Sequence, residues 1–431
     1  LNSTLNAIVI FSDDPLAEAR EAERAIVRGD STGPLHGIPY TLKDCVQVAG
    51  MRTTMGSKLF VDYVSDEDAT IYTRLKAAGG ILLGKTNMPE FALWWQTDNL
   101  LWGLTPNPWN LNLTAGGSSG GEASAIICGL SPLGVGTDLG GSIREPAAFC
   151  GLVGLKPTLG RVAYTGILPQ TLLRAIHVGP MARSVTDVAL ELSVVAGADG
   201  LDIFAPPVTV GDYRDLNTPS TNLRVGWSPT MGMPVEPEIQ RAVARGAEAL
   251  KEAGMIVEQV EIPAVLEHDS GLISSIVYRT EARRALATIV QGRESELTPL
   301  LRRRYLETPP HKLQDYLDAN SSWDLLRQGV ADWFTRYDLF LCPTVPMTAY
   351  PHDQREFTIE GQILSERHAL SATVPWDLTG SPAMSVPFGL TSSGLPIGVQ
   401  LVGRHFDELT VLRAAKVLED RAEDVGRPPV D

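Results

Sequence analysis

Several residue classes are scarce in this 431-residue sequence, and each scarcity disfavours a class of protein. Only four cysteines occur and no two form a Cys-x-x-Cys pair, so neither a zinc site nor a disulfide framework is indicated. Basic residues number 36 against 51 acidic ones, which disfavours a broad nucleic-acid or anionic-membrane surface. No apolar run reaches the length of a transmembrane helix, and no signal peptide is evident. We therefore expect a cytoplasmic protein with no nucleic-acid or membrane partner.

The residues that are present alternate between strand-like and helix-like patterns. The 40 glycines and 30 prolines are spread along the chain rather than gathered in a linker. The clearest unit spans residues 223–262, where two short apolar runs flank a helix with an apolar stripe at Ile239, Val243, Ala247 and Leu250. A similar strand–helix–strand pattern covers residues 36–83. These units predict one α/β domain over residues 1–431, with a sheet covered by helices.

Residues 270–335 differ from the rest because they are rich in Arg, Glu and Leu. This composition predicts surface helices. The basic triplet at 302–304 is expected to lie on a solvated helix face rather than in a binding site.

The segment 114–161 carries the strongest chemical signal. Two Gly-Gly-Ser triplets end at Ser118 and Ser142, and the helix and short strand expected between them can bring the two serines face to face. Glycine-rich turns let backbone N–H groups converge, so the amides of Leu139, Gly140, Gly141 and Ser142 are candidates for an oxyanion hole. Helix caps and phosphate loops use similar turns, but no Gly-Lys-Ser/Thr or Gly-x-Gly-x-x-Gly motif follows. Nucleophilic catalysis by Ser142 fits better.

A serine nucleophile needs a base, and none of the seven histidines sits in a motif that pairs it with an acid. The Gly-x-Ser-x-Gly nucleophile elbow is also missing around Ser142. Lys43 is the alternative, because it ends an apolar run and burial lowers the pKa of a lysine toward neutrality. A salt-bridged core lysine would show the same pattern, so these residues alone leave both roles open.

Four segments together resemble a known family. Residues 116–162 (GGSSGGEASAIICGLSPLGVGTDLGGSIREPAAFCGLVGLKPTLGRV) closely resemble the signature of the amidase signature hydrolases. GIPYTLKD at 37–44 resembles that family's lysine strand, and GSPAMSVPFG and GLPIGVQLVG near the C-terminus resemble its later motifs. The resemblance implies a single α/β domain with a mixed sheet of about eleven strands between helices. The family's N-terminal helices are expected to be absent from this chain.

The resemblance also implies roles for individual residues. Ser142 would be the nucleophile, Ser118 the bridging serine held by a cis peptide, and Lys43 the base. Four further residues would support the site: Ser119, Thr137, Asp138 and Arg144. Asp377 stands where many members carry asparagine, which affects hydrogen bonding near the site. No cofactor and no metal are implied.

The segment before the first serine motif resembles the acyl-pocket region of the family. The candidate pocket residues are Ala92, Leu93, Trp94, Trp95 and Gly117, with Trp102 close by in sequence. Such aromatic residues suit an aryl or long-chain group, although plain core packing explains them equally well.

We therefore predict a hydrolase that cleaves C–N bonds of amides and carbamates (urethanes) with apolar or aryl groups. It would act through an acyl- or carbamoyl-enzyme on a small-molecule substrate, as a monomer or homodimer, like the bacterial stand-alone amidases. The alternative is a glutaminase subunit of a tRNA-dependent amidotransferase complex. A non-catalytic binding protein is a third alternative, disfavoured because Lys43, Ser118 and Ser142 are all present.

Overall fold

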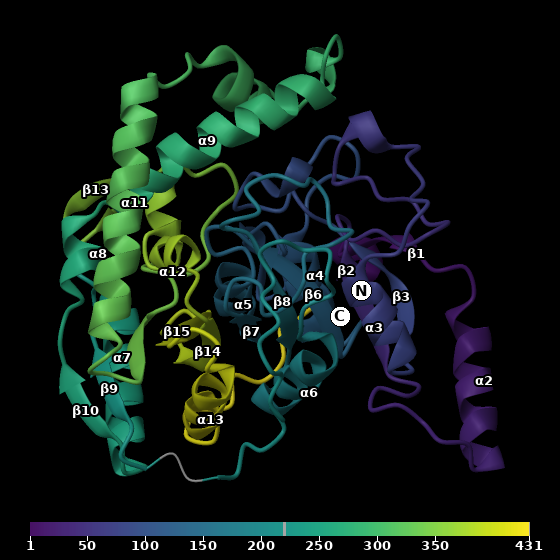
Figure 1. Ribbon diagram of the computed structural model, residues 1–431, viewed down its shortest axis with the longest axis horizontal. Coiled ribbons are helices and arrows are strands. Elements are labelled where there is room, and N and C mark those ends of the chain that lie inside the picture. The colour runs from purple at the N-terminus through teal and green to yellow at the C-terminus, as the bar shows by residue number, and fades with distance from the viewer. Residues whose placement is uncertain (219–220, 431) are drawn as a thin grey trace.

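A mixed sheet of eleven strands forms the centre of the computed structural model, which describes residues 1–218 and 221–430 (Figure 1). In spatial order its strands are β1 (Ile8–Phe11), β3 (Ile81–Thr86), β2 (Pro39–Lys43), β6 (Leu133–Asp138), β8 (His177–Ala182), β7 (Val153–Lys156), β14 (Ala383–Leu390), β15 (Pro396–Gly403), β11 (Leu339–Pro343), β9 (Arg224–Trp227) and β10 (Ile256–Gln259). β3, β2 and β6 run parallel, as do β11, β9 and β10, and antiparallel pairs join the two sets. The predicted mixed sheet of about eleven strands is confirmed.

Helices cover both faces of this sheet. They are α1 (Asn2–Leu5), α2 (Pro15–Arg28), α3 (Thr70–Ala77), α4 (Gly120–Ile127), α5 (Arg144–Cys150), α6 (Val185–Val195), α7 (Pro237–Glu252), α8 (Pro263–Glu267), α9 (Ser270–Ile289), α10 (Pro299–Leu301), α11 (Leu313–Trp333), α12 (Val374–Thr379) and α13 (Glu408–Glu419). α4 and α5 pack on one face, and α6, α7 and α13 pack on the other. Two hairpins, β4 (Pro106–Asn107) with β5 (Asn110–Thr114) and β12 (Glu356–Ile359) with β13 (Gln362–Ser365), lie outside the sheet.

The predicted unit at 223–262 appears as β9, α7 and β10. The stripe of Ile239, Val243, Ala247 and Leu250 is buried against the sheet because these positions recur on one side of a helix. β9 and β10 are parallel neighbours, as this connection requires. Among the described helices, none is long and apolar enough to cross a membrane.

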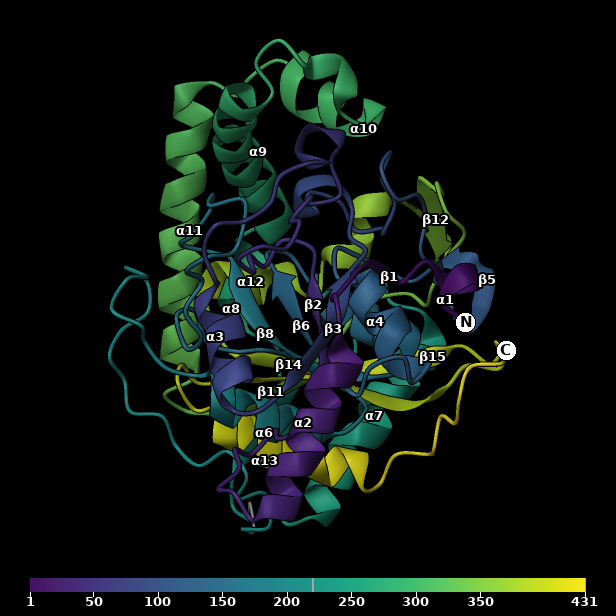
Figure 2. The ribbon, with the colours of Figure 1, turned by 90° about the vertical axis from the view of Figure 1, so that its right-hand side faces the viewer.

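Residues 270–335 form helices, as expected, but one detail of that prediction is wrong. α9 and α11 stand side by side at one end of the molecule, and a short π-helical segment, η4 (Arg302–Glu307), joins the same layer (Figure 2). Arg303 is exposed and Arg302 pairs with Glu307, as a solvated face would. Arg304 instead turns inward and stacks on the indole rings of Trp94 and Trp95, which lie 5.7 and 5.3 Å from its guanidinium carbon.

Candidate active site

Lys43 lies at the end of β2, where it is completely buried. Its Nζ donates to Ser118 Oγ at 2.7 Å, to Thr137 Oγ1 at 2.8 Å and to Ser119 Oγ at 3.0 Å. No carboxylate among the described residues lies within ion-pair distance of this amine. Burial therefore lowers the pKa of Lys43 from 10.5 to about 8, although the charges of Cys45, Asp138 and Glu122 oppose the fall. About a tenth of the amine is therefore neutral at pH 7.

The first glycine–serine loop places two hydroxyls within hydrogen-bond distance of the Lys43 amine. It runs from β5 to the start of α4, with a cis peptide between Gly117 and Ser118. Gly136 on β6 makes this approach possible, because a Cβ at that position would come within 2.9 Å of Ser119 Oγ. The loop also meets the second one directly, since the Ser119 amide donates to the Ser142 carbonyl at 3.2 Å. The predicted face-to-face arrangement of the two loops is present.

The second loop links β6 to α5 and carries Ser142. Asp138 Oδ1 accepts from the Gly141 amide at 2.5 Å, and Asp138 Oδ2 accepts from the Ile143 amide at 3.0 Å. One of the four amides expected to point at a substrate oxyanion, that of Gly141, is thus committed to a carboxylate. In the described part of the chain, the amides of Leu139, Gly140 and Ser142 have no protein acceptor.

Arg144 holds this second loop against the sheet. Its buried guanidinium binds Asp138 at 2.9 and 3.1 Å, Asp377 at 2.7 Å and Gln400 Oε1 at 2.8 Å, and it donates to the Thr373 carbonyl at 3.0 Å. Burial opposes ionisation of Asp138, but the Arg144 charge and hydrogen bonds outweigh it and hold the pKa of Asp138 below its ordinary value. Burial, reinforced by the charge of Asp138, raises the pKa of Asp377. The side chain of Asp377 is therefore shifted toward its neutral form.

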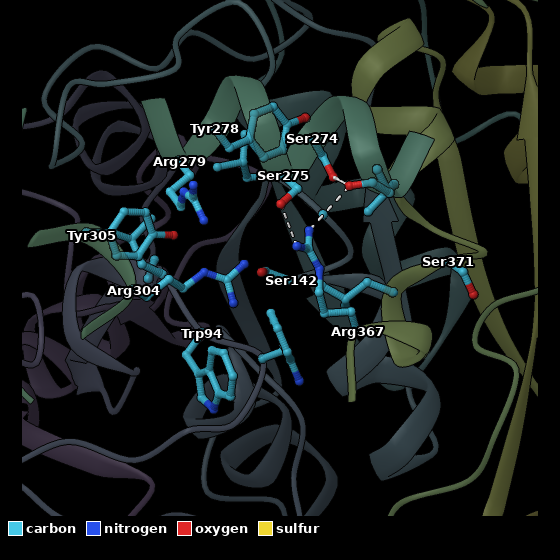
Figure 3. Close-up of a pocket in the computed structure, with 18 residues that line it drawn as sticks. Trp94, Ser142, Ser274, Ser275, Tyr278, Arg279, Arg304, Tyr305, Arg367 and Ser371 are labelled. Carbon is cyan, nitrogen blue, oxygen red and sulfur yellow. Dashed lines mark hydrogen bonds between the residues drawn. The ribbon is translucent and has the colours of Figure 1, made fainter. Parts of the chain in front are cut away.

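A cavity of about 800 Å³, including its open mouth, lies over Ser142 (Figure 3). Four of the predicted pocket residues line it: Ala92, Leu93, Trp94 and Trp95. The indole rings of Trp94 and Trp95 are stacked, with their centroids 3.8 Å apart. A narrower extension of the cavity is lined by Ser118, Thr137 and Ser142 together. The two serines assigned to chemistry therefore share one enclosed space.

Two residues named with the pocket lie elsewhere. Gly117 is not among the residues that line the cavity; it is packed beneath, where a Cβ would come within 2.8 Å of the Gln96 amide. The indole of Trp102 donates to Thr54 Oγ1 at 3.0 Å, and Trp102 does not line the cavity. The expectation that aromatic residues form part of the wall holds for Trp94 and Trp95 and is wrong for Trp102.

Polar residues that the sequence did not assign to the site complete the cavity. They are Ser274, Ser275, Tyr278 and Arg279 on α9, Arg304 and Tyr305 on η4, and Arg367 and Ser371 beside α12. They come from three segments that are far apart in the chain, so no local pattern marks them as neighbours. Among the described residues, no group of three His, Cys, Asp or Glu side chains is placed to hold a metal ion.

Comparison with known proteins assigns the chain to a family. The family model described as "Amidase" matches residues 1–412. The chain belongs to the amidase signature family. This agrees with the expected fold and with the serine and lysine motifs at the buried site.

Individual amidase signature proteins resemble the chain over nearly its full length. A glutamyl-tRNA(Gln) amidotransferase subunit of Moorella thermoacetica is 36% identical, with 97% of this chain and 89% of that protein covered. A solved structure described as a vestigial protein complex that reveals the evolutionary origins of an s-triazine catabolic enzyme superposes with a TM-score of 0.92 at 30% identity, covering 100% and 93% of the two chains. A bacterial aryl acylamidase superposes with a TM-score of 0.86 at 28% identity, covering 97% and 89%. The chain is accordingly an amidase-signature C–N hydrolase.

Proposed function

We propose that Ser142 is the nucleophile of this hydrolase, with Lys43 as the base and Ser118 as the relay between them. The observation that carries the proposal is the 2.7 Å contact between Lys43 Nζ and Ser118 Oγ, together with the cavity that Ser118 and Ser142 share. Three hydroxyl acceptors around one amine suit its charged form. The neutral form has a lone pair that can accept the proton of Ser118 instead.

The reaction then follows from these positions. Neutral Lys43 takes the proton of the Ser118 hydroxyl as Ser118 takes that of Ser142, and Ser142 Oγ attacks the carbonyl carbon of the substrate. The free amides of Leu139, Gly140 and Ser142 are available to stabilise the oxyanion. When the C–N bond breaks, the proton returns through Ser118 to the leaving nitrogen. Water then hydrolyses the acyl-enzyme, or the alkoxycarbonyl-enzyme that a carbamate leaves when its C–N bond breaks. A carbamoyl-enzyme forms instead where the carbamate C–O bond breaks, and the proton then goes to the leaving alcohol oxygen.

The test is covalent labelling combined with substitution. A fluorophosphonate reagent should modify the peptide that contains Ser142, and Ser142→Ala should lose both labelling and turnover. Ser371→Ala is the matched control, because Ser371 lines the far side of the same cavity and should change neither result (Figure 3). Labelling of another serine while Ser142 stays free would overturn the assignment.

A free-standing amidase is the form of this function that we favour. Apolar side chains from two sides of the cavity, Leu93, Trp94, Trp95, Leu370 and Val374, offer surface for an acyl chain or an aryl group. Burying a phenyl-sized group on such surface contributes about 2 kcal/mol. The purified chain alone should therefore hydrolyse N-aryl amides or N-aryl carbamates, which liquid chromatography can follow. A chain that hydrolyses neither would not be the enzyme that we propose.

The second candidate is a glutaminase that supplies ammonia to a partner enzyme. The 36% identity to the glutamyl-tRNA(Gln) amidotransferase subunit over 97% of the chain favours it. Under this hypothesis glutamine would be the best substrate and partner proteins would be required. Comparing kcat/KM for glutamine and for N-aryl amides, with the chain alone and with candidate partner proteins added, separates the two candidates.

A further inference from the structure

The cavity over Ser142 contains three arginines and no carboxylate. Arg279, Arg304 and Arg367 all line it, and no Asp or Glu among the described residues does so. None of the three forms an ion pair in the described part of the chain. Other arginines behave differently: half-buried Arg174 pairs with Glu281, and exposed Arg355 pairs with Asp353 and Glu366.

The positive charges of the three arginines repel one another. Burial lowers the pKa of Arg367 and of Arg279, and the charge of Arg304 lowers both further. Asp269 is the carboxylate whose charge opposes this effect at Arg367, but it lies beyond ion-pair distance and caps α9 through the Leu272 amide. Uncompensated positive charge in a cleft attracts an anion.

The guanidinium of Arg304 is positioned to bind such an anion. Its guanidinium lies between Trp94, Trp95 and Tyr305, at 5.7, 5.3 and 5.8 Å, which fixes its plane while leaving its N–H groups without a protein acceptor among the described residues. Figure 3 shows its end pointing into the cavity toward Ser142.

Arg367 and Arg279 are held in different ways. Arg367 is tethered by Ser275 Oγ at 2.6 Å and the Gly271 carbonyl at 3.3 Å, and Arg279 by the Pro309 carbonyl at 3.2 Å. A guanidinium has five N–H donors, so each retains free ones.

We infer that the substrate of this hydrolase carries a carboxylate on the acyl side of its amide, within reach of Arg279, Arg304 and Arg367, and carries no ammonium group there. A carboxylate matches the two-pronged donor geometry of arginine. An α-ammonium beside that carboxylate, as in glutamine, would meet three positive charges and no negative one. The inference rests on the proposed function and selects the class of substrate within it.

Binding tests this inference without any requirement for turnover. Isothermal calorimetry with glutarate should show binding to the wild-type chain that weakens at least about tenfold in Arg304→Leu, since a charge-assisted hydrogen bond contributes that much or more. Arg303→Leu is the matched control, because it removes the same charge from the adjacent, exposed position outside this cavity. No glutarate binding, or equal weakening in both variants, would overturn the inference.

Selectivity provides the second readout. Three p-nitroanilides share one acyl chain: glutaryl, its methyl ester, and γ-L-glutamyl, which adds the ammonium group. The wild-type kcat/KM for the glutaryl compound should exceed each of the others at least about tenfold, and the Arg304→Leu variant should lose this preference. Hydrolysis of all three at similar rates would refute the inference and leave the proposed function standing. Failure to hydrolyse any of them, with Ser142 unlabelled, would refute the proposed function, and calorimetry would still decide the anion site.

Discussion

Raising the pH from 7 to 9 should increase kcat/KM of this hydrolase about tenfold, because the increase follows the neutral fraction of Lys43. With a pKa of about 8, the buried amine is about 9% neutral at pH 7 and about 90% neutral at pH 9. A solvent-exposed lysine with a pKa of 10.5 would be neutral only about 0.03% of the time at pH 7. Burial therefore increases the amount of active base about 300-fold.

The assay is a pH profile of kcat/KM for a neutral N-aryl amide, which has no titrating group of its own in this range. The rate should rise with a single inflection near pH 8 and then level off. Lys43→Arg keeps the positive charge but does not deprotonate, so it should lose more than about 99% of kcat. A flat profile, an inflection above pH 10, or an active Lys43→Arg variant would refute the role of Lys43 as base.

The remaining predictions concern stability and packing. Lys43→Met should be inactive, yet its free energy of unfolding in urea at pH 7 should be no lower than that of the wild type, because burying the charged Lys43 amine destabilises the folded wild type by about 3 kcal/mol. A decrease in the free energy of unfolding above about 2 kcal/mol would contradict this. Arg144→Met, which leaves Asp138 without its partner, should lower the free energy of unfolding by about 3–5 kcal/mol, whereas Asp377→Asn should change it by less than about 1 kcal/mol. Gly136→Ala should reduce kcat because its Cβ would come within 2.9 Å of Ser119 Oγ, and also of Ile143 Cγ1 and Met181 Sδ, whereas Gly211→Ala, which meets open space, should not. Equal activities of the two variants would show that the close approach at Gly136 does not matter.

The sequence was sufficient to predict what local patterns encode. The alternation at 223–262 predicted β9, α7 and β10, because burial on one side leaves a periodic trace in the residues. The glycine–serine triplets predicted two tight loops, since only small residues let a hydroxyl approach the sheet as Ser119 does at Gly136. The end of an apolar run made Lys43 a candidate base, and the resemblance to one family favoured that role over a salt-bridged core lysine. The contacts of Lys43 with Ser118 and Ser119 agree with that assignment.

The chemical character of the cavity could not be predicted in the same way. Arg279, Arg304 and Arg367 lie on three separate segments, and each looks like an ordinary surface arginine within its own helix or turn. These three arginines lie close together only because α9, η4 and the residues before α12 pack against one another. The commitment of the Gly141 amide to Asp138 is also invisible in the sequence, because it depends on a loop conformation with φ of 130° at Gly141.

The hydrogen bonds of Arg144 determine when, during translation, the loop that carries Ser142 can reach its final conformation. The loop that carries Ser142 is fastened by Arg144 to Thr373, Asp377 and Gln400, the last of which lies 256 positions further along the chain. During translation these partners leave the ribosome long after the loop itself. Because contacts this distant in sequence form late, Ser142 should reach its working geometry only after the segment from Thr373 to Gln400 has also left the ribosome. A nascent chain that stops before Thr373 would therefore carry Ser142 on a loop that lacks the contacts of Arg144 with Thr373, Asp377 and Gln400.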